Sequence, residues 1–233
     1  NMLSKMPGFD KLGNSETQRV IYSAILGATS PGPKVAQNTK SGSAQYLKYL
    51  RTGKFSTEAP PKGTSVENIN MAGFGQYGYP DGLKMVQFLL DKFGEDGFAD
   101  FMLSPITKKE LTKLRLEAGF KSGPTGMSGT GDSQHLGATI LGDKAGKFML
   151  NIQGYPTTTK DKWFVRTIRR SEGTFGDHMV KKIDKNKGTE KMVELGQPKN
   201  QSERLLMDQL VKDIVNDPQL KDLNLSEQDA QAI

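Results

Sequence analysis

Apolar residues recur at intervals of three and four in segment after segment of this 233-residue chain, the spacing of one buried helix face. No window alternates strictly between apolar and polar residues with the β-branched content typical of strands. The sequence therefore predicts an all-α fold. The first predicted helix begins at the cap candidates Asn14 and Ser15 and ends before Pro31, and the second lies between Val35 and Gly53. The others cover 81–94, 107–119, 143–153, 161–171 and the segment from 202 to Pro218.

Composition excludes several classes of function. The chain has no cysteine, which rules out disulfides, zinc–thiolate sites, thiol nucleophiles and iron–sulfur clusters within it. The apolar runs are far shorter than the ~18 residues of a membrane span, and no secretory signal opens the sequence, so we expect a protein that is neither membrane-bound nor secreted. The net charge of +6 favours a polyanionic partner.

Two glycine-rich loops imitate phosphate-binding motifs. Residues 73–78, GFGQYG, fit GxGxxG, but no predicted strand precedes them and Pro80 follows, so we interpret them as a connector. Residues 126–133, GMSGTGDS, have P-loop glycine spacing with Asp132 where the phosphate-binding lysine belongs. A carboxylate there repels phosphate, and we predict that 121–133 form a mobile loop near a binding surface.

The two histidines, His135 and His178, are too few for a histidine-rich metal site. Each is more typical of a polar surface or loop residue. We expect neither a metal nor a cofactor.

The segment GDKAGKFMLNIQGYPTTTKDKWFVR, residues 142–166, resembles the helix-hairpin-helix DNA glycosylases, which include the 8-oxoguanine glycosylase and endonuclease III types. The resemblance places Gly142 on the second hairpin glycine, Lys144 on the catalytic lysine and Asp161 on the catalytic aspartate. Arg166 then matches the arginine five residues after that aspartate. The sequence departs from the family at Thr139, Ile140 and Trp163, which replace a proline, the first hairpin glycine and a histidine.

A second segment, ILGATSPGPKV at 25–35, looks like the end of an early helix of the same family, where a polar residue enters the gap left by an extruded base. Thr29 stands in the position of the gap-filling glutamine. The segments ATSP, TGKF and SEQDAQAI also resemble parts of large phage proteins, which implies a phage origin. We expect a cytoplasmic or phage-associated location.

The chemistry of the two matched residues is consistent with a lysine nucleophile. Lys144 is predicted in the first turn of its helix, where the positive end of the helix dipole disfavours an ammonium and so favours the nucleophilic amine. Asp161 is predicted at a helix start that stabilises its charge, and it would balance the cation that develops on the sugar. Without the resemblance, a solvated lysine and a capping aspartate are the simpler interpretation.

Other residues of these segments are candidates for DNA contact. Lysine and arginine side chains along the second helix suit phosphate oxygens, and backbone amides around Gly142 suit another phosphate. Aromatic side chains near the site are candidates for stacking on an extruded base, although such residues more often complete a core. The DNA-contact candidates are Gly142, Lys162, Arg166, Arg169, Arg170 and Thr29, and the stacking candidates are Trp163, Tyr77 and Tyr79.

Together these features predict a glycosylase-like helical domain over 1–186 and a C-terminal helical extension over 187–233 packed on the same core. The resemblance implies a DNA glycosylase with AP-lyase activity, which acts on a modified or damaged base in double-stranded DNA through a lysine Schiff base. The alternative is a catalytically inactive DNA-binding module of a larger phage-derived protein.

Overall fold

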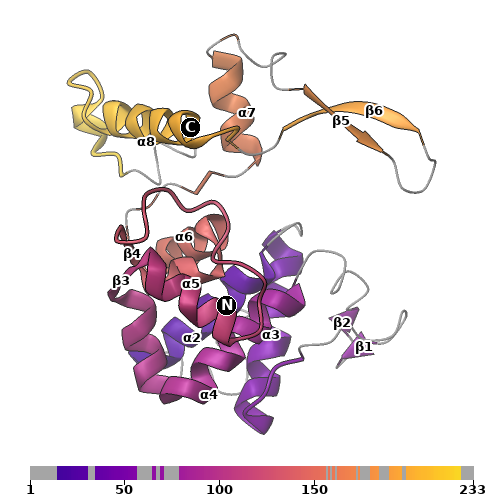
Figure 1. The fold of residues 1–233 in the computed structure, drawn as a ribbon. Coiled ribbons are helices and arrows are strands. Elements are labelled where there is room, and N and C mark those ends of the chain that lie inside the picture. Colours follow the sequence, from indigo (N-terminus) through magenta and orange to yellow (C-terminus); the bar gives the residue numbers. More distant parts are fainter. Residues whose placement is uncertain are drawn as a thin grey trace. The chain divides into compact units, whose positions relative to one another are not determined.

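The computed structural model describes residues 15–30, 35–56, 65–66, 69–70, 79–155, 157, 159–160, 162–171, 173, 179–183, 189–195 and 198–226. The chain forms two compact units, Asn1–Tyr155 and Pro156–Ile233 (Figure 1). The division at residue 155 differs from the predicted boundary at 186. Residue 186 instead lies between two strands that pair with each other within the second unit.

The first unit is built mainly from helices. Its α-helices are α2 (Glu16–Thr29), α3 (Val35–Thr52), α4 (Tyr79–Leu103), α5 (Lys108–Glu117) and α6 (Asp143–Ile152), and a 3₁₀-helix, η2 (Gly137–Leu141), precedes α6. Two short antiparallel strand pairs accompany them. One is a hairpin of β1 (Ser65–Val66) and β2 (Ile69–Asn70), and the other pairs β3 (Pro105–Thr107), before α5, with β4 (Gln134–Leu136), after it.

Local sequence signals explain where several of these helices begin. Ser15 caps α2 by accepting a hydrogen bond from the backbone of Gln18, and Thr107 forms a capping box with Glu110 at the start of α5. The predicted end of a helix at Gly94 is confirmed, because Gly94 has a positive φ of 70° and a non-helical backbone that divides α4 into two helical stretches. The second stretch, which runs to Leu103, was not predicted.

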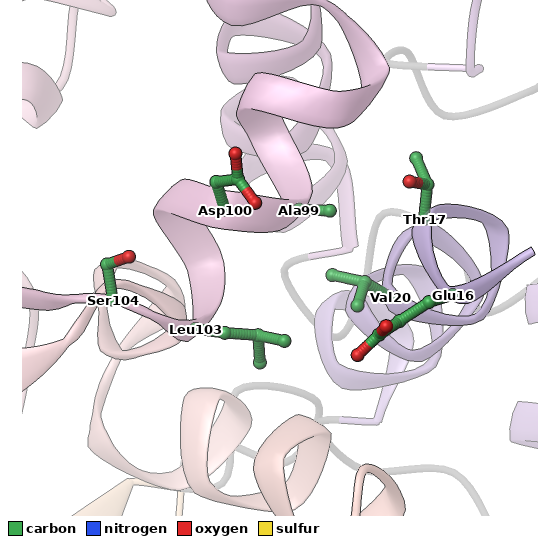
Figure 2. Close-up of a pocket in the computed structure, with 7 residues that line it drawn as sticks. All are labelled: Glu16, Thr17, Val20, Ala99, Asp100, Leu103 and Ser104. Atoms are coloured by element: carbon green, nitrogen blue, oxygen red, sulfur yellow. The ribbon is translucent and has the colours of Figure 1, made fainter.

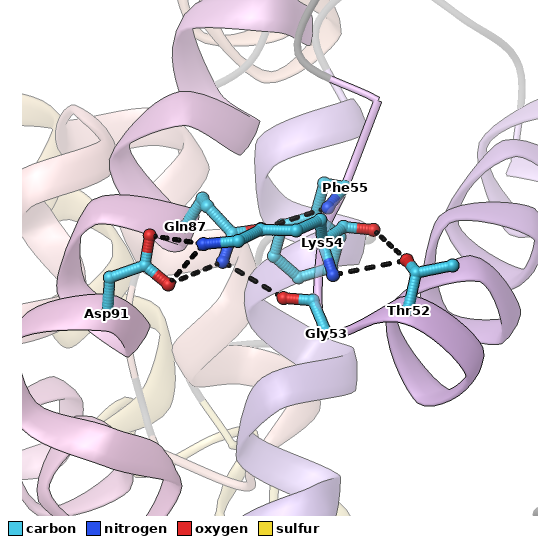
Figure 3. A network of polar contacts seen from close by, with 6 residues as sticks. All are labelled: Thr52, Gly53, Lys54, Phe55, Gln87 and Asp91. Atoms are coloured by element: carbon cyan, nitrogen blue, oxygen red, sulfur yellow. Dashed lines mark hydrogen bonds and ion pairs between the residues drawn. The ribbon is translucent and has the colours of Figure 1, made fainter.

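The end of α3 is fixed by a polar network to α4, which Figure 3 shows. Gly53 takes a left-handed φ of 69° just after the helix. The Gln87 amide on α4 donates to the Gly53 carbonyl (3.2 Å) and accepts from the Phe55 backbone amide (2.9 Å), while Lys54 pairs with Asp91 at 2.8 Å. The network satisfies backbone groups that the helix end leaves open.

Helix α2 supplies much of the core of the first unit. Its residues Val20, Ile21, Ala24 and Ile25 are completely buried, and it packs against α3, α4 and α6. The predicted apolar face of this helix is therefore confirmed, because the same residues repeat at helical spacing and point into the core.

The second unit contains α7 (Lys162–Ser171), the antiparallel strands β5 (Met179–Ile183) and β6 (Glu190–Glu194), α8 (Gln201–Val215) and the short 3₁₀-helix η4 (Lys221–Leu223). Its small apolar core joins α7 to α8 through Phe164, Val165, Met207 and Val211. The sequence predicted both helices but not the β5–β6 hairpin.

Helices make up most of the described residues, which agrees with the predicted all-α class, and the described strands form only three two-stranded sheets. No helix within the described ranges is both long enough and apolar enough to cross a membrane.

Candidate functional site

Lys144 lies in the first turn of α6, as predicted. Its side chain is exposed and has no hydrogen-bond or ion-pair partner among the described residues. Gly142, two residues before Lys144, has a φ of 100°, a conformation that is strained for any other residue. A methyl group at this position would also lie 3.0 Å from the Thr125 hydroxyl. A glycine is thus required where the chain turns into the helix that carries Lys144.

The turn before Lys144 is packed into the core, which accounts for two departures from the resembled motif. Ile140 is fully buried and Thr139 is 5% exposed, so both side chains serve the core at positions where the family has glycine and proline. The backbone N–H of Gly142 donates to the Thr139 carbonyl at 2.9 Å, and that of Asp143 donates to the Thr125 carbonyl at 2.9 Å. These two amides are already satisfied, contrary to the prediction that amides around Gly142 are open to phosphate.

The end of α2 lies directly against the start of α6. A methyl group at Gly27 would lie 2.9 Å from the Ala145 carbonyl oxygen and 3.2 Å from Cβ of Met149. The fold therefore brings together the segments at 25–30 and 142–145, which resemble separate parts of one family.

Thr29 does not have the role predicted for it. The residue is fully buried, and its hydroxyl lies 2.9 Å from the Ile25 carbonyl oxygen and 2.6 Å from Oδ1 of Asn38. Its hydroxyl satisfies polar groups inside the protein, so Thr29 is not placed to enter a gap in DNA.

The glycine-rich loop at 121–133 is tied to α5 by its carbonyl groups. Nζ of Lys108 donates to the carbonyls of Met127 (3.3 Å) and Gly129 (2.8 Å), and the Lys109 backbone amide donates to the Gly131 carbonyl (2.8 Å). A P-loop instead turns its N–H groups toward an anion. The loop thus holds an internal cation, which agrees with the prediction that it is no phosphate cradle.

His135 on β4 lies beside this loop and beside α6. The pKa of its imidazole is lowered, chiefly because burial disfavours the charged ring, while a hydrogen bond with the Ser128 backbone and the charge of Asp143 oppose that effect. Its Nε2 is buried and has no hydrogen-bond partner in the part of the chain that the structure describes. Asp143 is also buried and pairs with Lys147 at 3.1 Å, within the same helix as Lys144.

Arg169 corrects the predicted DNA-contacting face of α7. Its side chain is 0% exposed, and Nε and Nη2 donate to the two carboxylate oxygens of Glu203 on α8 at 2.7 and 3.1 Å. A further hydrogen bond reaches the Leu195 carbonyl. The guanidinium therefore joins α7 to α8, whereas Arg170 is exposed and Arg166 is half-buried.

The other predicted site residues are not placed. Asp161 and Tyr77 lie outside the described residues, as do the side chains of Lys162, Trp163 and Tyr79. Lys144 belongs to the first compact unit and α7 to the second.

A pocket of about 420 Å³, which the sequence does not predict, lies between α2 and the end of α4. Figure 2 shows the carboxylates of Glu16 and Asp100 near an apolar surface formed by Val20, Ala99 and Leu103. Two carboxylates repel a polyanion, so this pocket does not suit a DNA backbone. Within the described ranges, no group of three or more His, Asp or Glu residues is arranged to hold a metal ion.

No family model, no curated protein and no solved structure matches this chain.

Proposed function

We propose that the chain is a DNA glycosylase with AP-lyase activity, in which Lys144 forms a Schiff base with the sugar of a modified or damaged nucleotide. The observation that carries this proposal is the contact between the end of α2 and the start of α6. Two short segments that resemble different parts of the same enzyme family are remote in sequence and adjacent in the fold. Lys144, which is exposed and has no partner among the described residues, stands at their junction.

The proposed chemistry needs an accessible amine. The Nζ of Lys144 adds to the C1′ aldehyde of an abasic site, and loss of one water molecule gives the imine. In the proposal, Asp161 balances the positive charge that develops on the sugar as the glycosidic bond breaks. The partner is double-stranded DNA, from which the base is extruded before reaction.

Reductive trapping tests the proposal directly. Borohydride reduces the imine to a stable amine, so wild-type protein should form a covalent adduct with abasic-site duplexes, whereas Lys144→Gln should form none and should still bind DNA. Lys109→Gln is the matched control, because Lys109 is an exposed lysine in the first turn of another helix, α5. Equal trapping by Lys144→Gln and wild type would refute Lys144 as the nucleophile.

Asp161→Asn extends the experiment to the second residue of the motif. The substitution keeps size and capping ability but removes the charge, and a loss of this kind typically lowers the rate by about 10²- to 10³-fold. Base release from lesion-bearing duplexes under single-turnover conditions measures the effect. An unchanged rate would leave Asp161 as a helix cap without a catalytic role.

A second function, a catalytically inactive DNA-binding module of a larger phage-derived protein, is favoured by the placement of Thr29. This residue stands in the position of the gap-filling glutamine, yet it is fully buried and occupied by an internal partner. If wild-type protein binds duplex DNA but neither releases a base nor traps an abasic site across a broad lesion panel, this function replaces the enzymatic one.

Both functions predict the same basic surface on α7. Replacing Arg166 and Arg170 by alanine should weaken duplex binding and reduce the slope of log K against log salt by roughly one for each phosphate group that the variant no longer neutralises. Lys40→Ala on α3 is the control, because it also removes a positive charge from an exposed site. An unchanged salt slope in the double variant would exclude α7 as a DNA-binding face.

A further inference from the structure

The backbone turn that presents Lys144 is held from one side by Arg115, a residue of α5 that the proposed chemistry does not use. Nη1 of Arg115 donates to the Ile140 carbonyl at 2.9 Å, and Nε donates to the Ser122 carbonyl at 3.2 Å. The guanidinium therefore joins three segments, namely α5, the loop after it and the turn before α6.

The surroundings of Arg115 restrict its motion. The guanidinium carbon lies 4.3 Å from the centroid of the Phe120 ring, a cation–π contact with the aromatic side chain. Burial lowers the pKa of Arg115, and the charge of Asp81 opposes this only in part. The carbonyl groups that accept hydrogen bonds from Arg115 stabilise its partly desolvated charge. Movement of either carbonyl away from the guanidinium therefore costs free energy, so the two hydrogen bonds depend on each other.

A second contact from the same loop reaches the turn three residues further on. The Thr125 carbonyl accepts the backbone N–H of Asp143 at 2.9 Å, next to Lys144. Arg115 holds this loop at Ser122 and the turn at Ile140. The backbone before Lys144 is thus held at two positions, at Ile140 by Arg115 itself and at Asp143 by the loop that Arg115 anchors.

We propose that Arg115 is a positioning residue for Lys144: by bridging Ser122 and Ile140 it fixes the backbone from which the lysine reaches the DNA sugar. The inference rests on the proposed function for its catalytic consequence, but the positioning itself is a property of the fold. Lysine can replace arginine only in part here, because a single ammonium lacks the planar fork that donates to two carbonyls while lying against a ring.

The first experiment measures positioning without any reaction. Hydrogen exchange of the Asp143 amide, followed by NMR, should be at least about 10-fold faster in Arg115→Ala than in wild type, because the loop that supplies its acceptor loses its anchor. Arg115→Lys should fall between the two. Arg51→Ala, at an exposed position at the end of α3, is the matched control and should leave this amide unchanged.

The second experiment uses an abasic-site duplex with the full chain. Arg115→Ala should lower kcat for imine formation by roughly 10- to 100-fold with little change in KM, since misplacement of a nucleophile affects the reacting geometry rather than binding. Arg115→Lys should restore part of kcat. A general loss of folded protein would instead lower the active fraction equally in both variants, which thermal denaturation detects.

The outcomes separate the two proposals. Faster exchange at Asp143 with no trapping by wild-type protein would reject the enzymatic function and retain the positioning role. Unchanged exchange in folded Arg115→Ala would reject the positioning role. If Arg115→Ala does not fold, Arg115→Lys decides the question, and wild-type exchange together with wild-type kcat in that variant overturns the proposal.

Discussion

Replacing Gly27 by alanine tests the contact that places α2 against α6. Gly27 lies inside α2, two residues before its last residue, and its Cα faces the backbone of the first turn of α6. An added methyl group would lie 2.9 Å from the Ala145 carbonyl oxygen and 3.2 Å from Cβ of Met149. Neither atom is the end of a flexible side chain, so α6 itself must move to make room.

Two opposing terms set the size of the effect. Alanine is favoured over glycine inside a helix by about 1 kcal/mol. Overpacking a close backbone contact costs about 1–3 kcal/mol. Because the contacted oxygen belongs to a helix whose own hydrogen bonds resist displacement, we expect the larger part of that range and a net destabilisation of about 1–2 kcal/mol.

Equilibrium urea denaturation measures the change, and Gly42→Ala provides the matched control. Gly42 also lies within a helix, but its added methyl group would meet Cδ2 of Leu26 at 2.6 Å, the mobile end of a side chain that can rotate away. Gly42→Ala should therefore be near neutral. A Gly27→Ala variant that is as stable as wild type, or more stable, and whose α6 amides keep their chemical shifts would contradict the expected displacement of α6.

Two further predictions concern buried charge. Arg169→Ala should destabilise the folded chain by about 3–5 kcal/mol, because Glu203 keeps its place at the α7–α8 interface without its partner. Equilibrium denaturation measures the change, with Arg51→Ala as the control. A loss of stability below about 1 kcal/mol would contradict the prediction. His135→Gln should flatten the dependence of stability on pH. Burial lowers the folded-state pKa of His135 below its ordinary value of 6.5, so its contribution is present above that value and is lost as the pH falls toward the folded-state pKa. Titration from about pH 7.5 to about pH 5.5 should show the greater loss in wild type, and parallel curves for the two proteins would contradict the assignment.

The sequence by itself determined the helices whose causes are local. Capping needs only residues three positions apart, so Ser15 and Thr107 could be recognised as helix starts, and both caps form. Apolar spacing likewise predicted the buried face of α2 and the helices α6, α7 and α8 to within a few residues. The exposed place of Lys144 in the first turn of α6 follows from the same local pattern.

Tertiary structure decided which of the polar residues remain available. A cationic residue at helical spacing is equally suited to solvent, DNA or a carboxylate on another helix, and only the packing of α8 on α7 assigns Arg169 to Glu203. The same holds for Thr29, whose partner Asn38 comes from α3. The β5–β6 hairpin was missed because pairing between strands depends on a partner strand rather than on the period of either segment.

The contact between Gly27 and Ala145 is the clearest case of information that lies outside any local pattern. Neither residue carries a distinctive side chain, and more than a hundred positions separate them in the sequence. Close approach of two helix backbones requires small residues at the crossing point, a condition that many glycines and alanines in this chain satisfy equally well. Only the packing of α2 against α6 selects this pair, and with it the surface on which Lys144 stands.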